Sequence, residues 1–287
     1  MDKSFEQRLA QNYQSLSNRL REAGDFITEN PLDVATRSLR SVAQDANLPP
    51  ATFSRLAREL GYDTYEQVRE DMRSKIGRRV DSFADRADRL LHDHEAGSFD
   101  FFAAHERACQ ANIAALPESV DSTQLTQVVE HLHNARRVAV MAALGSRGIA
   151  EYMLYIARFL SGAWTMLDGD GASMASGLTD LSKNDVLFIV TKPPFARKGL
   201  AAAELARKKG IFVVVLTDSH TCPALRHADA ALMVKSDSPH FYSSYVATVC
   251  LIESIIGMLA ARSGPDAQRR IAEIEMQSRS LEEVRDL

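Results

Sequence analysis

Residues 38–61, SLRSVAQDANLPPATFSRLARELG, contain two apolar patterns that decide the fold of the N-terminal part. In the first half, apolar residues recur at the three- and four-residue spacing of one helical face: Leu39, Val42, Ala43 and Ala46. The second half repeats the pattern with Phe53, Leu56, Ala57 and Leu60. The stretch therefore predicts two short amphipathic helices, one directly after the other.

The segment between the two helices predicts a tight turn. Asn47 tolerates the left-handed conformation that ends a helix, and Leu48 buries the turn. Pro49-Pro50 fix φ where the second helix starts, and Gly61 closes that helix as a C-cap. This is the geometry of a helix-turn-helix, so double-stranded DNA is the first partner to consider.

The outward face of the hairpin carries hydroxyl and guanidinium groups, which are able to bond phosphates and base edges from the major groove. We predict these DNA-binding residues: Ser41, Pro50, Thr52, Ser54, Arg55 and Arg58. Because the net charge of the chain is -4, attraction to phosphate requires a local patch. That patch would comprise Arg37, Arg40, Arg55, Arg58, Arg69, Arg73 and Lys75. A plain helical hairpin with solvated arginines would show the same periodicity.

Residues 48–72 follow a recognisable order: Thr52, then Arg55 three residues on, then the closing Leu60-Gly61-Tyr62. In this order LPPATFSRLARELGYDTYEQVREDM resembles the N-terminal DNA-binding domain of the RpiR/MurR family of bacterial transcriptional regulators. The resemblance extends upstream and covers approximately residues 5–78, an ordinary domain size. It implies that the hairpin is a DNA reader.

Composition limits the class of protein. With 287 residues, 45% hydrophobic and 25% charged, the chain is long enough for two globular domains. Its three cysteines are odd in number and lack CxxC spacing, which argues against a disulfide framework and a structural zinc site. No signal segment is recognisable, and no apolar run approaches the length of a membrane span. We therefore expect a cytoplasmic protein with no membrane partner.

We place a helix-turn-helix domain at residues 1–79, a helical linker at 80–119 and an α/β domain at 120–287. Four histidines occur in two pairs, His92 with His94 and His131 with His133. Residues two apart do not share a helical face, so these pairs predict solvated surface instead of a metal site. We predict neither a metal nor a cofactor.

From Arg136 onward, short apolar runs alternate with helical segments. The expected strands are Val138–Met141, Trp164–Leu167, Val186–Val190, Phe212–Leu216 and Ala231–Val234. Strands that are apolar throughout predict a doubly wound parallel sheet with helices on both faces. The fold class is therefore α + α/β, an all-helical N-terminal domain followed by a parallel-sheet domain. Ligands of such sheets bind at the carboxyl ends of the strands.

Two loops at predicted strand ends, residues 142–153 and 190–199, carry hydroxyls and cations, as does the start of the last long helix. The predicted ligand-binding residues are Ser146, Arg147, Thr191, Lys192, Arg197, Ser243 and Ser244. Together they predict a pocket for a small anionic effector. The alternative is a structural turn whose charged side chains are simply solvated.

Several features of this half resemble the SIS (sugar isomerase) domain, the usual effector-binding partner of the RpiR-type helix-turn-helix. They are the order of elements, the spacing of Ser146 and Ala150, LARKKG before FVVVLTDS, and the HADAALMV strand. The resemblance covers approximately residues 120–265, again one domain. It implies that residues 120–287 bind an effector and form the dimer.

Both loops depart from the family pattern. The first loop usually reads Gly-x-Gly-x-Ser in the family, whereas this chain has Ala142, Leu144 and Ser146. The second usually reads Ser-x-Ser-Gly-x-Thr, and here those places hold Thr191, Pro193, Pro194 and Ala196. Two prolines remove two amide donors. We therefore expect Lys192, Arg197 and Lys198 to supply charge in place of loop amides.

The resemblance implies a DNA-binding transcriptional regulator. Its binding to operator DNA would be modulated by a small anionic metabolite, a sugar phosphate or related acid. We expect a homodimer or higher homo-oligomer that uses the apolar segment VATVCLIESIIGMLAA, residues 246–261. We predict no catalytic residues, because the carboxylates and histidines form no constellation with an activated partner. Two alternatives stay open: a SIS-fold sugar-phosphate isomerase, and a ligand-independent DNA-binding dimer.

Overall fold

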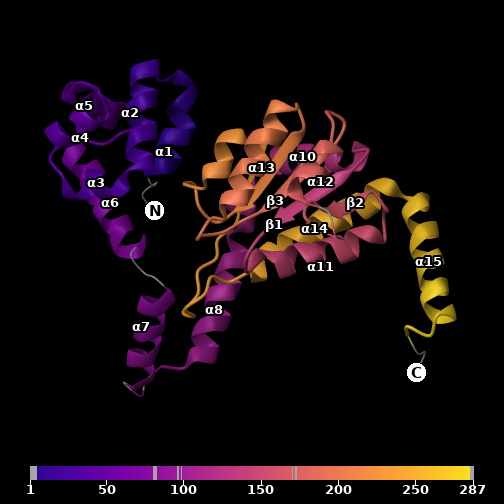
Figure 1. Cartoon of the computed structure of the whole chain (residues 1–287). Helices are drawn as coiled ribbons and strands as arrows, with labels where there is room; N and C mark the ends of the chain where they lie inside the picture. Colours follow the sequence, from indigo (N-terminus) through magenta and orange to yellow (C-terminus); the bar gives the residue numbers. More distant parts are fainter. Residues whose placement is uncertain are drawn as a thin grey trace. The chain divides into compact units, whose positions relative to one another are not determined.

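The computed structural model describes residues 5–79, 83–95, 97, 99–169, 171 and 173–284 (Figure 1). The chain divides into two compact units, Met1–Phe99 and Asp100–Leu287. Each unit has its own hydrophobic core, and no core cluster draws residues from both.

The first unit is all-helical. Its elements are α1 (Phe5–Asn12), the 3-10 turn η1 (Tyr13–Ser15), α2 (Asn18–Glu29), α3 (Pro31–Thr36), α4 (Leu39–Asp45), α5 (Pro50–Glu59), α6 (Tyr65–Arg79) and α7 (Phe83–Glu95). Phe53 of α5 is fully buried at the centre, where its ring meets Phe26 and Tyr65 edge-on at centroid distances of 6.3 and 6.0 Å. These aromatic contacts fix α5 against α2 and α6.

The predicted helix-turn-helix is present as α4 and α5. Asn47 adopts the left-handed conformation at φ 54°, and the amide of Leu48 donates to the carbonyl of Ala43 at 3.0 Å. Pro50 is the first residue of α5, as predicted. At the far end Gly61 has φ 78°, and the amide of Tyr62 donates to the carbonyl of Ala57 at 2.9 Å. Both helices thus end in the hydrogen-bonded left-handed cap expected from the sequence.

The second unit contains a five-stranded, fully parallel sheet, which confirms the predicted α/β class. Its strands are β1 (Val138–Ala142), β2 (Trp164–Met166), β3 (Val186–Val190), β4 (Phe212–Thr217) and β5 (Ala230–Met233), in the order β2-β1-β3-β4-β5. The register pairs Ala142 with Val190 and Val190 with Leu216. The carboxyl ends of the central strands therefore meet at one edge.

The helices of this unit are α8 (Phe101–Ala114), α9 (Leu116–Ser119), α10 (Ser122–Asn134), α11 (Ser146–Arg158), α12 (Met174–Thr179), α13 (Arg197–Lys208), η2 (Pro223–His227), α14 (Val246–Ser263) and α15 (Pro265–Ser280). The sequence analysis missed α15. Of the helical linker predicted at residues 80–119, residues 100–119 fall within the second unit, where α8 packs on α14. The buried Asn112 side chain anchors α8, because it bonds both backbone groups of Asp237.

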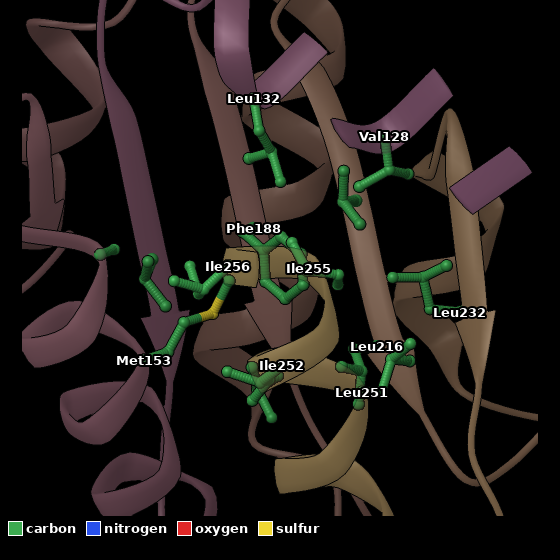
Figure 2. Packing of buried hydrophobic residues seen from close by; sticks show 14 of the residues in the cluster. Val128, Leu132, Met153, Phe188, Leu216, Leu232, Leu251, Ile252, Ile255 and Ile256 are labelled. Carbon is green, nitrogen blue, oxygen red and sulfur yellow. The ribbon is translucent and has the colours of Figure 1, made fainter. Parts of the chain in front are cut away.

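Helices cover both faces of the sheet. On one face, Phe188 and Leu216 pack against side chains of α10, α11 and α14, including Leu132, Met153 and Ile255 (Figure 2). On the other face, Leu187 and Val215 pack against α12 and α13. Neighbouring residues of one strand therefore point to opposite cores, which explains why the strands are apolar throughout.

Helix α14 corrects one expectation. It has 18 residues and a mean hydropathy of 1.6, which is long and apolar enough for a membrane span, so the expectation that no apolar run approaches that length is wrong. One face of the helix enters the chain's own core, where Leu251, Ile252 and Ile255 are buried (Figure 2).

Candidate functional site

The first candidate surface is the outward face of α5. Arg55 and Arg58 are exposed, whereas Thr52 and Ser54 are half-buried on the same helix. Among the described residues, neither arginine makes a side-chain hydrogen bond or an ion pair. Pro50 is exposed at the first position of the helix. The second helix of the hairpin thus presents two uncompensated cations to solvent.

Ser41 on α4 is less available than the sequence suggested. Its hydroxyl accepts a hydrogen bond from the guanidinium of Arg37. Arg37 also bonds Asp45 and lies 3.5 Å from Asp33, and the hydrogen bond with Asp45 raises the pKa of the guanidinium. Arg37 is therefore neutralised within the unit, so it cannot contribute a full charge to the predicted basic patch.

The rest of that patch is divided. Arg69 pairs with Glu66 at 2.7 Å and donates to the carbonyl of Val34, so it ties α6 to α3. The side chains of Arg73 and Lys75 lie outside the described residues. Arg40 is exposed at the start of α4, at the opposite end of that helix from the hairpin turn. The uncompensated charge of the described hairpin therefore comes from Arg40, Arg55 and Arg58.

The Leu60-Gly61-Tyr62 motif has a structural role. The Arg8 guanidinium donates to the carbonyls of Leu60 and Gly61 at 3.2 and 3.0 Å and lies 4.6 Å over the Tyr62 ring. The Tyr62 hydroxyl donates to Asp71 at 2.8 Å, and Asp71 also accepts from the Phe5 amide at 2.9 Å. These contacts hold the carboxyl end of α5 between α1 and α6, so the exposed face of α5 stands on a fixed support.

The second candidate surface is the carboxyl edge of the sheet, where Lys192 follows β3. Its side chain is only 5% exposed. The ammonium donates to the Ser244 carbonyl at 2.8 Å and lies 4.3 Å from the centroid of the Tyr245 ring. Burial lowers the pKa of Lys192 to about 8, against an opposing attraction to Asp218. Lys192 is therefore a buried cation and not a solvated loop residue. At neutral pH it carries its charge inside the domain.

Ser146 faces the same aromatic side chain from the other loop. It is 3% exposed at the start of α11, and its hydroxyl lies 2.9 Å from the hydroxyl of Tyr245. Burial raises the pKa of Tyr245 to about 12, so the phenol is neutral at pH 7. Lys192 and Ser146 therefore both contact Tyr245, and the three residues supply one cation and two hydroxyl groups, while Ser244 contributes its carbonyl.

The loop between β1 and α11 keeps a shape that glycine favours. Leu144 stands where the family pattern has a glycine, yet its φ is 53° and its side chain is 65% exposed. A left-handed leucine costs about 1–2 kcal/mol. At Gly145, a Cβ atom would lie 2.1 Å from the Tyr242 hydroxyl, so only glycine allows this tyrosine to approach the loop. The loop is therefore strained at one residue and closely packed at the next.

The other predicted ligand-binding residues differ from these in their contacts and exposure. Arg147 bonds Glu151 and Asp168, each at 3.0 Å, and these partners engage its charge. Thr191 is half-buried, and its amide extends the sheet by bonding Leu216. Arg197 is exposed at the first position of α13, and Ser243 is half-buried. The described contacts place Ser146, Lys192 and Ser244 together, and they leave Arg147 and Arg197 outside that group.

Tyr245 is the member of this cluster that the sequence analysis missed. A tyrosine after two serines gives no periodic signal, and its partners Lys192 and Ser146 precede it by 53 and 99 residues along the chain. In the structure the rings of Tyr242 and Tyr245 stack with centroids 6.4 Å apart, a contact that the sequence does not reveal. Among the described residues, no group of histidine, cysteine and acidic side chains is arranged to hold a metal.

Comparison with protein families and relatives gives a consistent result. Residues 131–258 match the family model of the SIS domain. A protein of Haemophilus influenzae, named an uncharacterised HTH-type transcriptional regulator, is 23% identical over 77% of this chain and 76% of its own length. A protein of Caldanaerobacter subterraneus with the same description is 21% identical over 85% of this chain and 86% of its own length.

Two solved structures share the fold. The sugar isomerase domain of an RpiR transcription factor from Sphaerobacter thermophilus has a TM-score of 0.57 and 21% identity over 60% of this chain and 96% of that domain. The Vibrio vulnificus NanR protein, solved in complex with ManNAc-6P, has a TM-score of 0.56 and 20% identity over 97% of this chain and 99% of its own. The second similarity spans both units of the chain.

Proposed function

The chain belongs to the RpiR family, whose members join a helix-turn-helix to a SIS domain, and we propose that it is a DNA-binding transcriptional regulator that responds to a small anionic metabolite. Its operator binding is modulated by occupancy of the SIS domain. The role is not enzymatic, in agreement with relatives that are named transcriptional regulators. A regulator of this kind acts in the cytoplasm.

The observation that carries the proposal is the exposed cationic face of α5. Arg55 and Arg58 have no intramolecular partner among the described residues, while the opposite face of the helix is buried through Phe53 and Leu56. A helix held in this way places guanidinium groups in the major groove, where they bond phosphates and base edges. Thr52, Ser54 and Pro50 lie at the same helix start and complete the contact surface.

Arg55→Ala tests this assignment in the full chain. We expect operator affinity to fall by about 1–3 kcal/mol, because one phosphate or base contact is removed. Arg19→Ala is the matched control, since Arg19 is exposed on α2 in the same unit but off the hairpin. The assignment is wrong if both variants bind operator as the parent does, in an electrophoretic or fluorescence titration with equal thermal stability.

The anionic effector is assigned to the carboxyl edge, with Lys192 as the charged ligand and the hydroxyls of Ser146 and Tyr245 as hydrogen-bond donors. The family relative NanR was solved with ManNAc-6P, which supports a sugar phosphate or related acid as the class of effector. Because Lys192 is bonded to the Ser244 carbonyl, an entering anion must compete with that contact. Ligand binding thereby couples to the start of α14.

A thermal-shift screen against sugar phosphates, sugar acids, sulfonates and carboxylates tests the effector class, since a bound ligand stabilises the fold by mass action. Lys192→Ala together with Arg197→Ala should abolish the shift and leave DNA affinity unchanged. Lys183→Ala is the control, because Lys183 is exposed ahead of β3, at the opposite end of the strand from Lys192. Absence of any hit would favour the ligand-independent dimer.

We assign the homodimer to α11 and α15, because the apolar face of α14 that holds Leu251, Ile252 and Ile255 packs in the core. A groove of about 600 Å³ lies between them, lined by Tyr155, Phe159 and Ile274 among others. Near its start α15 is anchored by the Arg270 guanidinium, which donates to the Arg158 carbonyl at 3.2 Å. Farther along, Met276 and Leu281 are 59% and 69% exposed. A helix with so few tertiary contacts has only marginal stability in water.

The occupant of this groove is the α15 helix of a second copy. The groove wall carries Arg158 and Arg270, and α15 exposes Glu273 and Glu275, so charges of both signs are available for pairing between two copies. Ile274→Asp should convert the dimer to a monomer in light scattering. Gln268→Asp, on the exposed face of the same helix, should leave the dimer intact. A dimeric Ile274→Asp protein would place the interface elsewhere.

A further inference from the structure

A second polar cluster lies on α8, beside the segment that leads into α14. The Cys109 sulfur is 3.5 Å from Nε2 of His105, one helical turn earlier, and 3.6 Å from the hydroxyl of Ser244. Cys109 and His105 are both half-buried, so small molecules have access to the sulfur. The cluster lies next to the carboxyl-edge site and has no part in the regulator function proposed above.

The imidazole of His105 is held in place on two further sides. Its Nδ1 is 3.4 Å from the hydroxyl of Ser238, and its ring stacks on Phe101 with centroids 5.6 Å apart and an interplanar angle of 6°. Ser238 is fixed in turn, because its hydroxyl accepts from the His240 amide at 3.0 Å. A nucleophile, a base within hydrogen-bond reach and a third group that orients the base form the arrangement of an activated thiol.

Ser244 joins this thiol to Lys192. Its hydroxyl contacts the Cys109 sulfur, and its carbonyl accepts from the Lys192 ammonium at 2.8 Å. The same hydroxyl accepts from the Val246 amide at 3.3 Å, which fixes it at the start of α14. Among the described residues, Ser244 is therefore the one through which a change at the Cys109 sulfur reaches the Lys192 contact.

We propose that Cys109 is a reactive thiol that small hydroperoxides oxidise to a sulfenic acid, with His105 as the base, and that this modification loosens the Ser244–Lys192 contact. His105 takes the thiol proton at Nε2, and the sulfur attacks the terminal oxygen of the hydroperoxide. The S–O bond forms as the O–O bond breaks, and the leaving alkoxide takes the proton from His105. One thiol and one hydroperoxide give one sulfenic acid and one alcohol. The effect on Lys192 bears on regulation only through the proposed function, whereas the thiol chemistry stands alone.

Thiol labelling of the full chain tests the first half of the proposal. Iodoacetamide should alkylate Cys109 at least about tenfold faster than Cys250, which is equally half-buried and has no histidine partner among the described residues. His105→Gln and Ser238→Ala should each bring the rate of Cys109 towards that of Cys250. His94→Gln changes an exposed histidine in the other unit and should leave the alkylation rate of Cys109 unchanged.

After treatment with hydrogen peroxide, a 1,3-dione probe should label Cys109, as detected by peptide mass spectrometry. Equal rates at Cys109 and Cys250, or a rate unchanged in both cluster variants, would overturn the reactive thiol.

Acylation of lysine tests the second half without DNA or effector. Acetic anhydride should modify Lys192 slowly in the reduced protein and several times faster after hydrogen peroxide, with exposed Lys198 as the internal standard. In Cys109→Ser, peroxide should leave the rate at Lys192 unchanged. An unchanged Lys192 rate in the oxidised parent would refute the coupling. Because neither readout involves operator or metabolite, failure here is distinguishable from failure of the proposed function.

Discussion

The two units handle positive charge in opposite ways. In the helical unit, Arg55 and Arg58 stand exposed on α5, and their partners are absent among the described residues. In the α/β unit, Lys192 is buried, bonded to a carbonyl and placed over an aromatic ring. An exposed guanidinium costs nothing to leave unpaired and attracts a polyanion at long range. A buried ammonium interacts strongly at short range and excludes whatever does not fit.

This difference assigns the two units different kinds of ligand. The exposed face suits a large, uniformly charged partner, for which many weak and salt-dependent contacts add up. The buried cation suits one small anion, because each contact is made in the low-dielectric environment beside Tyr245 and Ser146. The following experiments test the separation between the two units, beginning with the largest expected effect.

Loss of the support beneath α5 should abolish DNA binding and spare the other unit. Phe53→Ala removes a fully buried ring that contacts Phe26 and Tyr65, at a cost of about 3–5 kcal/mol. In calorimetry we expect the transition of the helical unit to move to a much lower temperature. Leu251→Ala in the core of the second unit is the reciprocal control. A single shared transition in both variants would show that the units do not unfold separately.

The buried charge of Lys192 should make stability depend on pH. Folding lowers the pKa of this lysine from 10.5 to about 8, so the unfolded chain binds the proton more tightly between these values. The penalty is complete below pH 8 and disappears as pH rises towards 10.5. The free energy of unfolding of the parent, relative to Lys192→Met, should therefore rise by about 2–3 kcal/mol between pH 7 and pH 10. Urea titrations of both proteins measure it, and a difference independent of pH would mean that Lys192 is solvated.

The contact between the two loops of the anion site should have a smaller effect. Ser146→Ala removes the 2.9 Å hydrogen bond to the Tyr245 hydroxyl, and we expect a loss of about 1 kcal/mol in the free energy of unfolding. Ser176→Ala is the control, because Ser176 is exposed on α12. If Ser146→Ala matches Ser176→Ala in urea denaturation, the hydroxyl contact does not stabilise the domain.

The smallest expected change in stability comes from two turns, one in each unit. Asn47 and Leu144 are both left-handed, with φ 54° and 53°, and each lies shortly before a helix of the candidate sites. Asparagine tolerates this region and leucine does not. Leu144→Gly should therefore stabilise the protein by about 0.5–1 kcal/mol, whereas Asn47→Gly should change stability by a few tenths at most. Equal changes in the two variants would indicate that the Leu144 conformation carries no strain.

The fold could be predicted largely from local patterns. The period of Val42, Phe53 and Leu56 gives the faces of α4 and α5, and Asn47 and Gly61 mark helix ends through their own conformational preferences. Continuous apolar runs located all five strands. Periodicity did not reveal α15, because this helix has few apolar residues and buries only Ala267.

The candidate sites could be predicted only in part. Residue type indicated that Arg55 and Arg58 would be exposed, since an unpaired arginine on the polar face of a short helix is almost always in contact with solvent. Residue type could not show that Arg37 is neutralised by Asp45 or that Lys192 is buried. Those outcomes depend on contacts between distant segments, such as Lys192 with Ser244. Three-dimensional structure is needed to separate loop cations that are solvated from those that are enclosed.

The position of α14 along the chain has a consequence for synthesis on the ribosome. Among the described residues the core of the helical unit extends from Phe5 to Met72, so this unit is able to fold while the remainder is still being made. The sheet differs, because α14 follows all five strands and covers one of its faces with Leu251, Ile252 and Ile255. Until these residues emerge from the ribosome, Phe188 and Leu216 remain uncovered. The nascent α/β unit therefore exposes apolar surface for longer than the helical unit, and it is the part of this protein more prone to aggregation during synthesis.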